Sequence, residues 1–600
     1  MGSSIDSPRR VEGEARPEAP LRPAATVMRL KRLGSFHPTR LSFVRSLVRR
    51  MGREGWSFRQ RHHDLDAEGF GRIVYEIETP KGLLTFCGFS NALAPEERTD
   101  RVIAEKWDTA FALSAGRIDE AAIERLSQAA PRQEAARYGA DELVLSRANR
   151  SVRLFDKVAA ALAAGRQPDL AEVVAVGYLM RTTAVYGNGK FGLADLPRLW
   201  RDGVFALPYE AEMLMVYMIR QFSFDLIEHI ARRRDPTRAV PLSRLTRRGL
   251  GIGNATGLGM APFLVGHPML FNNWILARER ALARVRAVPS ATPEAAARFR
   301  ALLDRAIAHV AQWDTDDSGQ RRRIAKLHAE LAALRGHANA LVAGPHPWDR
   351  VVAETETAQS LECSELIVSL VIELYPDLVD DLEHGTGSPE RDRVDPAMSL
   401  GALKALIETR YDWALGVDYE QPRQRHLFWY RSAEKDEPRL GERFNEPGAE
   451  RELPLGIALM ADALHRELAR LPSAELRRST GEFLLEQPRW RGILRRIQSL
   501  APLPYAEIRD NLLGETCLPV DLLRCKLAIF GAGKFDPKSD RWTRITLYQG
   551  APVIEELADP QADDWAFPAF SIPLAPRQGG EGRGEGVPAT DSPHDVEADR

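Results

Sequence analysis

One stretch constrains the fold more than any other: YEAEMLMVYMIRQFSFDLIEHIARRR, the most hydrophobic part of the chain with helical character. Charged residues are spread along its length, among them Glu212, Arg220, Asp225 and Glu228. A lipid bilayer penalises such charges, so we expect a helix buried in a protein core and not a membrane span. With 600 residues, the chain is long enough for about two to four domains and can build a core around this helix.

The remaining pattern predicts a mainly α fold with α+β elements. Helical spacing of apolar residues dominates residues 116–515, for example in DELVLSRANRSVRLFDKVAAALAAG and DLAEVVAVGYLMRTTAVYG, and indicates a large helical core domain. Residues 28–115 carry one such helix and three β-rich runs, WSFRQRHHDL, GRIVYEIETP and LLTFCGFS, as in a small N-terminal α+β domain. Residues 516–572 contain DLLRCKLAIFGAGKF and RWTRITLYQG, which we expect to pair as a C-terminal β-hairpin. Sheet is therefore expected only near the two ends of the chain.

Both ends of the chain are predicted to be disordered. Residues 1–27 are rich in Pro, Glu and Arg and lack the apolar run of a signal peptide. Residues 573–600 also have the composition of a disordered tail. We therefore expect a disordered leader and a cytoplasmic location. The four cysteines form no C-x-x-C pair, which argues against a disulfide framework and a structural zinc site.

The charge balance bears on the class of partner. The chain has 82 basic and 84 acidic residues and a net charge of −2, so no global field favours nucleic acid or an anionic membrane. We expect no nucleic-acid partner and no membrane partner, and a homo-oligomer is compatible with the sequence. Local clusters of arginine instead suggest an anionic small molecule.

The glycine-rich segment RRGLGIGNATGLGMAPF is the first candidate for a ligand-binding loop. Its glycines would allow backbone N–H groups to converge on an anion. Asn254, Thr256 and Gly257 would contact the oxygen atoms of the ligand. Arg247 and Arg248 directly precede the glycines and suit a carboxylate or a phosphate. The alternative is that the glycines allow close packing of backbones and bind nothing.

The same segment resembles a dinucleotide loop in its spacing alone. From Gly253 to Gly259 it matches the G-x-x-x-G-x-G of short-chain dehydrogenases, and YGNGK matches their Y-x-x-x-K. A dinucleotide loop requires a hydrophobic strand before it. Here RAVPLSRLTRR precedes the glycines, and the two motifs occur in reverse order. We therefore expect no Rossmann fold, and the sequence identifies no cofactor.

A second candidate segment is YGNGKFG, which we expect to face the same cavity as the glycines. Lys190 would act as a catalytic base or as a charge partner of the anion. Tyr186 and Asn188 would contribute to substrate binding. The alternative is a helix C-cap, in which Gly187 or Asn188 takes the left-handed conformation.

A third candidate segment, residues 409–443, interleaves aromatic residues such as Trp413 with arginines. Arg431 would bind the substrate, and Glu434 would supply a carboxylate for proton transfer. The mixture suits a pocket for a charged, flat or amphipathic ligand. It suits a protein interface equally, because aromatic residues and arginines anchor interfaces. A solvated surface loop is the third interpretation.

Two segments with histidine or acidic residues are not expected to bind a metal ion. In HHDLD, neighbouring strand residues point to opposite faces, which separates the side chains. In DTDDSG, the twelfth position of a calcium loop is Ala325 and not a bidentate Glu. We expect the acidic residues of DTDDSG to cap the following helix.

These features predict a cytoplasmic enzyme that acts on an anionic small molecule bearing a carboxylate or a phosphate, with an undefined reaction. The candidate catalytic residues are Lys190 and Glu434. The alternative is a non-catalytic scaffold or regulatory protein that binds a partner through residues 409–443.

Overall fold

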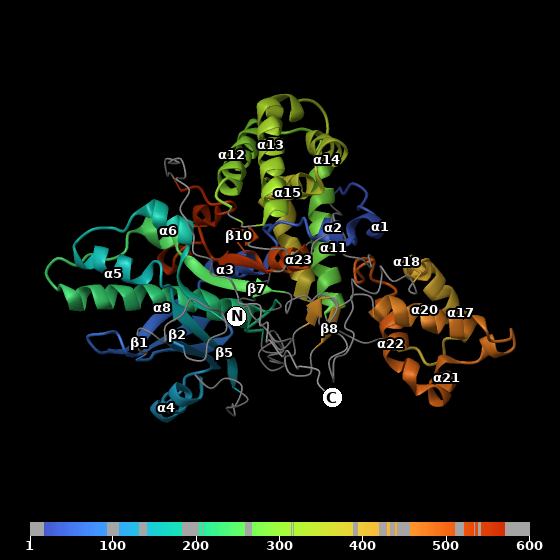
Figure 1. Ribbon diagram of the computed structural model, residues 1–600, viewed down its shortest axis with the longest axis horizontal. Coiled ribbons are helices and arrows are strands. Elements are labelled where there is room, and N and C mark those ends of the chain that lie inside the picture. The colour runs from blue at the N-terminus through green and yellow to red at the C-terminus, as the bar shows by residue number, and fades with distance from the viewer. Residues whose placement is uncertain are drawn as a thin grey trace, which may run out of the picture.

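The computed structural model places a nine-stranded sheet and a larger number of helices in a mixed α/β arrangement (Figure 1). It describes residues 17–92, 107–130, 141–182, 203–207, 209–257, 267–313, 315, 317–387, 394–418, 429–431, 438–440, 456–509, 521–532, 534–537 and 542–570.

The sheet has the order β1-β2-β3-β4-β5-β6-β7-β11-β10. Its strands are β1 (Ser57–Leu65), β2 (Gly71–Thr79), β3 (Gly82–Ser90), β4 (Thr109–Ala115), β5 (Glu142–Arg150), β6 (Tyr178–Thr182), β7 (Gly251–Gly257), β10 (Lys534–Pro537) and β11 (Trp542–Leu547). Neighbouring strands are antiparallel except β6 and β7, which are parallel. A single parallel pair does not make a doubly wound parallel sheet, so the sheet is not that of a Rossmann fold.

The helix α8 (Glu210–Arg234) is the predicted buried helix, and its buried position is confirmed. It packs against β3 to β7, and the ring of Phe222 lies so close to Gly88 that a Cβ there would come within 2.4 Å of it. Its charged side chains have partners: Asp225 accepts a hydrogen bond from Tyr75, and Glu228 binds Arg247. No helix in the described ranges is long and apolar enough to cross a membrane.

Two further groups of helices lie beside the sheet (Figure 1). The first has its own apolar core and consists of α11 (Pro268–Arg286), α12 (Pro293–Val310), α13 (Ser318–Leu341), α14 (Pro347–Ala358) and α15 (Leu361–Ile372). Asp317 accepts a hydrogen bond from the Gln320 N–H at the start of α13, which confirms the predicted cap. The second group, which we call the orange lobe after its colour in Figure 1, contains α17 (Leu400–Arg410), α18 (Asp412–Leu415), α20 (Gly456–Ala469), α21 (Thr480–Glu486) and α22 (Arg491–Leu500).

The prediction that sheet is confined to the two ends of the chain is wrong. The run DELVLSRANR forms β5, and DLAEVVAVGYLMRT divides into α6 (Leu170–Val176) and β6. Gly177 ends α6 with a φ of 85°, which the periodicity alone does not reveal. The run DLLRCKLAIF is a helix, α23 (Asp521–Phe530), so that part of the predicted first strand of the C-terminal hairpin is wrong. The hairpin itself is present, because β10, which begins at Lys534, pairs antiparallel with β11 in RWTRITLYQG. A short run that is apolar on all sides has no period that separates a buried strand from a buried helix.

The predicted disordered leader is also wrong for residues 17–27. The Arg22 guanidinium is buried and binds Glu279 and Glu365, each with an N···O distance of 2.8 Å. Burial of a charge is favourable only with such partners, and they could not be predicted because they lie more than 250 residues away along the chain. Residues 1–16 and 571–600 lie outside the described residues.

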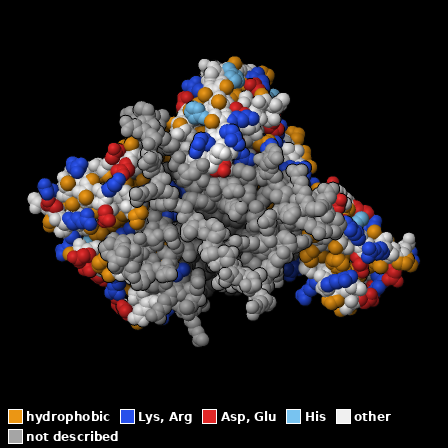
Figure 2. All heavy atoms as spheres, in the orientation of Figure 1, with side chains coloured by type: hydrophobic (Ala, Val, Ile, Leu, Met, Phe, Trp, Pro, Cys, Tyr) orange, Lys and Arg blue, Asp and Glu red, His pale blue; other side chains and the backbone are white. Residues whose placement is uncertain are grey.

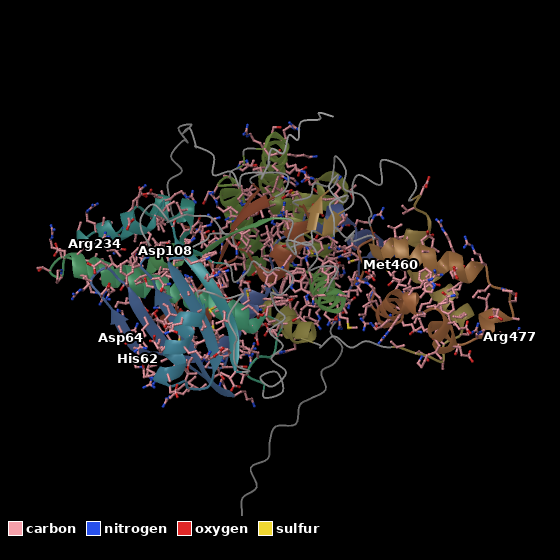
Figure 3. The ribbon with its side chains drawn as sticks, turned by 60° about the horizontal axis from the view of Figure 1, so that its bottom comes forward. His62, Asp64, Asp108, Arg234, Met460 and Arg477 are labelled. Atoms are coloured by element: carbon pink, nitrogen blue, oxygen red, sulfur yellow. The ribbon has the colours of Figure 1, made fainter. Side chains whose placement is uncertain are left out.

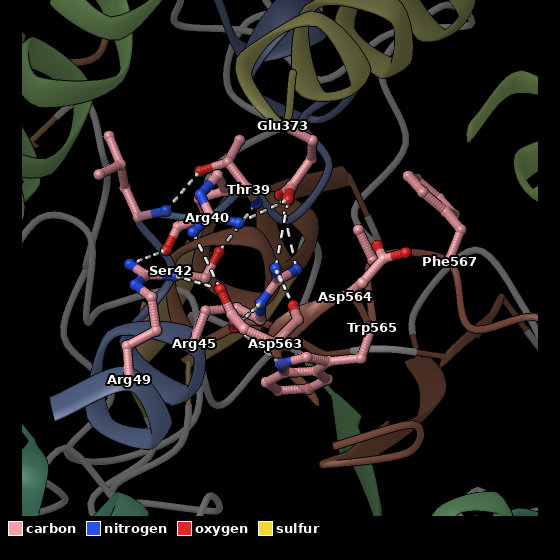
Figure 4. Close-up of polar contacts among 12 residues, drawn as sticks. Thr39, Arg40, Ser42, Arg45, Arg49, Glu373, Asp563, Asp564, Trp565 and Phe567 are labelled. Carbon is pink, nitrogen blue, oxygen red and sulfur yellow. Dashed lines mark hydrogen bonds and ion pairs between the residues drawn. The ribbon is translucent and has the colours of Figure 1, made fainter. Parts of the chain in front are cut away.

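A second cluster of buried arginines fixes α3 (Phe43–Arg53) to distant segments (Figure 4). Arg40 and Arg45 bind Glu373 and Asp563, and Arg49 binds Glu383 at 2.9 Å. Every guanidinium in this cluster has a carboxylate partner. We therefore assign the cluster to stability and not to ligand binding.

Candidate functional site

The glycine-rich segment is a strand and not a loop from Gly251 to Gly257, so the predicted anion-binding loop is wrong there. A Cβ at Gly251 would lie 2.1 Å from the backbone oxygen of Leu547, and one at Gly253 would lie 2.5 Å from the Tyr178 ring. Real Cβ atoms do not approach other atoms so closely, so both positions require glycine. These two glycines serve close packing inside the sheet, which was the alternative interpretation.

Arg247 and Arg248 lie in α9 (Arg244–Gly249), which leads directly into β7. Arg247 binds Glu228 at 2.9 Å, and Arg248 binds Glu556 at 2.8 Å. An anion that approached these arginines would have to displace a carboxylate that already binds them.

The polar residues predicted to orient the ligand lie inside the sheet. Asn254 is buried, donates from Nδ2 to the Thr182 oxygen at 2.8 Å, and has no hydrogen-bond partner at Oδ1 in the described structure. Thr256 and Gly257 pair through β7 with Thr543 and Trp542 of β11.

Of the remaining predicted site residues, only Arg431 lies within the described residues. Tyr186, Asn188, Lys190 and Glu434 lie outside the described residues. Arg431 lies on β8 (Trp429–Arg431) and pairs with Pro438 of β9 (Pro438–Leu440) in a separate two-stranded sheet. Since β6 and β7 are parallel neighbours, their carboxyl ends at Thr182 and Gly257 lie at the same edge of the sheet.

The sheet also carries arginines that the sequence did not single out. Register places Arg147 of β5, Arg181 of β6 and Arg544 of β11 on the face of the sheet that Gly253 shares. All three are engaged in further interactions, so they are not free charges. We do not assign a ligand site to them.

A surface groove in the orange lobe is a better candidate, and we call it the Arg410–Arg509 groove. Its lining residues come from the end of α17, the start of α18, the end of α22 and the segment that follows α22: Arg410, Tyr411, Trp413, Leu500, Ala501, Leu503, Pro504, Glu507 and Arg509. The lobe is on the right in Figure 3, where Met460 and Arg477 mark it. The groove includes the first residues of the aromatic and arginine-rich segment that the sequence predicted as a binding region.

The break between α17 and α18 shapes one wall of the groove. Tyr411 has a φ of −120° and a ψ of 20°, which ends α17 and turns the chain into α18. The Trp413 indole donates from Nε1 to the backbone oxygen of Arg410 at 3.2 Å. Its ring also contacts the Tyr411 ring, with centroids 5.9 Å apart. The indole is therefore held in one orientation at the edge of the groove.

Glu507, the one carboxylate among the lining residues of the groove, already accepts hydrogen bonds on both of its oxygens. Glu507 accepts hydrogen bonds from Arg496 at 2.7 Å on both oxygens and from the Tyr411 hydroxyl at 2.9 Å. Burial raises the pKa of Tyr411 well above its usual value, and the Glu507 charge raises it further. Tyr411 therefore remains a neutral hydrogen-bond donor to Glu507, and neither group is available as a base.

Among the described residues of the lobe, the two arginines of the groove lack the carboxylate partner that Arg466, Arg478, Arg489 and Arg496 have. In the described part of the chain, the guanidinium groups of Arg410 and Arg509 make no ion pair and no hydrogen bond. Burial lowers the pKa of Arg509, and the charges of Arg410 and Arg29 lower it further, whereas Asp412 acts in the opposite direction. Positive charge is therefore concentrated here without a bound carboxylate to balance it, which favours an anion.

Neither the described side chains on the visible face in Figure 2 nor the described metal-ligating residues indicate a further charged or metal site. Figure 2 shows basic and acidic side chains intermixed on the described parts of the visible face. Among the described residues, no group of three or more His, Cys, Asp or Glu could hold a metal ion. His62 and Asp64, labelled in Figure 3, bind Glu120 and Arg72 instead.

Only the part of this groove formed by Arg410 and Trp413 could be predicted from the sequence. Arg410 and Trp413 lie in the segment TRYDWAL, which stood out for its composition. Arg509 lies about a hundred residues further along the chain and has no motif around it. Its place in the groove depends on the fold, because its backbone N–H donates to the Met28 oxygen at 2.8 Å.

Comparison with known proteins gives no relative from which a function could be transferred. No protein-family model, no curated protein and no solved structure matches the chain.

Proposed function

We propose that the chain binds an anionic small molecule in the Arg410–Arg509 groove. One observation carries the proposal: two neighbouring guanidinium groups line a groove without any ion pair in the described structure. Most of the described buried guanidiniums have an acidic partner, whereas the half-buried Arg509 has none among the described residues. The planar donors of guanidinium suit the oxygens of a carboxylate or a phosphate.

The proposal covers binding and is separate from catalysis. Glu507 and Tyr411 are engaged with each other, so the groove supplies no free base among its lining residues. An enzyme that uses Lys190 and Glu434 remains a proposal from the sequence, because both residues lie outside the described ranges.

The second candidate function is the binding of an acidic segment of a partner protein. Arg410 is exposed and Arg509 is half-buried, so the groove is open at the surface and accessible to a peptide carboxylate. This is the scaffold alternative, since Arg410 and Trp413 begin the aromatic and arginine-rich segment.

The first prediction tests the groove by titration calorimetry with inorganic phosphate, citrate and a polyglutamate peptide. We expect at least one of them to bind the wild-type chain. The double variant Arg410→Gln/Arg509→Gln should bind it at least about tenfold more weakly, because charge-assisted hydrogen bonds contribute about 1.5–3 kcal/mol each.

The control is Arg470→Gln, an exposed arginine at the end of α20 in the same lobe that does not line the groove. It should bind like the wild type. Equal affinity of the double variant and the wild type for every probe would contradict the proposal. Binding of the peptide alone would favour the partner-protein alternative.

A further inference from the structure

The position of Trp413 in the groove indicates the shape of the ligand, whereas the two arginines indicate its charge. The indole is partly exposed and lines the groove. Its Nε1 is bound to the Arg410 oxygen, and the Tyr411 ring contacts it at a tilt of 31°. An indole held in this way presents a flat apolar surface whose orientation is already fixed before a ligand arrives.

The polar edge of the indole is bound to the backbone of Arg410, and both arginines line the same groove. The hydrogen bond from Trp413 to the Arg410 backbone places the indole directly beside the residue that carries one of the two charges. A ligand that contacts both features must therefore carry its anionic group close to a flat ring. Rings of this kind stack on aromatic side chains, and an adjacent guanidinium adds to the stacking.

The charge of the groove indicates which kind of anionic group the ligand carries. Arg410 and Arg509 together provide two positive charges, while the Glu507 charge is already balanced by Arg496. A phosphate monoester carries a charge of about −1.5 to −2 near pH 7, whereas a carboxylate carries −1. Of the other charges near Arg509, Asp412 acts against an anion and Arg29 acts in favour of one. A dianion therefore matches the two arginines of the groove better than a monoanion does.

We infer that the Arg410–Arg509 groove takes a phosphate monoester of a molecule with a flat ring, the chemistry of a nucleoside monophosphate. The phosphate binds Arg410 and Arg509, and the ring stacks on Trp413. This inference rests on the proposed function, since it identifies the class of anion bound at the same groove.

The second prediction measures the two parts of the ligand separately by titration calorimetry of the full chain. The probes are adenosine monophosphate, ribose 5-phosphate and adenosine. Adenosine monophosphate should bind at least about tenfold more tightly than ribose 5-phosphate, and adenosine should bind most weakly. Trp413→Leu should remove the advantage of adenosine monophosphate over ribose 5-phosphate and leave the affinity for ribose 5-phosphate unchanged.

Two controls separate the ring contact from a general effect on the lobe. Trp413→Phe retains a ring and should keep most of the preference for adenosine monophosphate. Trp490→Leu removes another partly buried tryptophan of the lobe, one that contacts Arg489 and lies outside the groove lining, and it should bind like the wild type. Thermal melting of each variant identifies any variant that does not fold.

The outcomes distinguish this inference from the proposal on which it rests. If ribose 5-phosphate binds as tightly as adenosine monophosphate and Trp413→Leu changes nothing, the ring contact is wrong and anion binding stands. If adenosine binds as tightly as its monophosphate, the phosphate contact is wrong. If neither these probes nor inorganic phosphate, citrate and polyglutamate bind the wild type, both the inference and the proposed function fail.

Discussion

Arg220 on α8 is a buried guanidinium that binds backbone and no carboxylate among the described residues. It donates to the carbonyl oxygens of Leu250, Arg247, Ala551 and Pro552 at 2.7 to 3.0 Å. Burial lowers its pKa to about 10, which leaves it charged at neutral pH. One side chain therefore joins α8, the start of β7 and the segment after β11.

The third prediction concerns this side chain. Arg220→Met should lower the free energy of unfolding by at least about 3 kcal/mol, because it leaves several buried carbonyl groups without a donor. Arg220→Lys should fall between the wild type and Arg220→Met, since its compact ammonium group reaches fewer carbonyls. Urea unfolding measures the change. The exposed control Arg470→Met should stay within about 0.5 kcal/mol of the wild type, and an equal effect at both positions would contradict the prediction.

His37, another single buried residue, allows a prediction about how the stability of the fold depends on pH. It is buried, its Nε2 accepts a hydrogen bond from Arg524 at 3.0 Å, and its ring stacks on Trp313. Burial lowers its pKa well below 6.5, the charges of Arg524, His309 and Arg278 lower it further, and Glu365 acts in the opposite direction. The folded protein therefore keeps His37 neutral.

The unfolded chain takes up a proton at His37 below about pH 6.5, whereas the folded chain does not, so stability falls as the pH falls. His37→Gln keeps an acceptor for Arg524 but cannot titrate. Between pH 6.5 and 5, its loss of stability should be shallower than that of the wild type by up to about 1.4 kcal/mol per pH unit. Urea unfolding across this range measures the slopes, and parallel slopes would show that His37 protonates in the fold.

At the scale of elements, β7 shows how a glycine-rich motif can arise from sheet packing alone. Gly251 and Gly253 allow the neighbouring strand and the Tyr178 ring to come close to the β7 backbone. Gly253→Ala should lower the free energy of unfolding by about 1–3 kcal/mol, since the new methyl group meets the ring. Gly336→Ala in α13, where a Cβ meets nothing within 4 Å, should instead stabilise the protein by up to about 1 kcal/mol. A destabilisation of the same size at both positions would contradict this account.

The elements that could be predicted from the sequence are those in which apolar residues recur at one clear spacing, helical or strand-like, along the whole element. The strands β1, β2 and β3 and the helices α8, α12 and α13 are of this kind. The strands β5 and β6 could not be predicted, because their apolar residues also fit a helix and their partners are β4 and β7. Arg509 was missed for a similar reason, since only the fold brings it to Arg410 and Trp413.

At the scale of the whole molecule, the N-terminal segment is a structural part of the helical core. Arg22 and Arg32 bind Glu356 and Glu365, and Arg22 also binds Glu279. Three arginines, Arg278 among them, hold the pKa of Glu365 far below its usual value, although burial opposes this. Without residues 17–34, Arg278 would be the one arginine of this cluster left to balance three carboxylates.

The last prediction follows from the balance between these buried arginines and carboxylates. A chain that lacks residues 1–16 should fold and melt like the wild type, because the buried contacts begin at Arg22. A chain that lacks residues 1–34 should not accumulate as folded protein, since uncompensated buried charges cost several kcal/mol. Soluble yield and circular dichroism measure the result. A cooperative melt at the wild-type temperature for the shorter chain would contradict it.

The order of the strands in the sheet also determines how long β7 waits during synthesis for its neighbour β11. Strand β7 ends at Gly257, but its neighbour β11 begins only at Trp542. At 5–20 residues per second, one edge of β7 stays open for roughly 15–60 s during translation. An open edge invites pairing with other nascent chains, and glycine is a poor strand former that weakens such pairing. We therefore expect the glycines of β7, which fit the finished sheet, also to limit pairing between nascent chains while this edge is open.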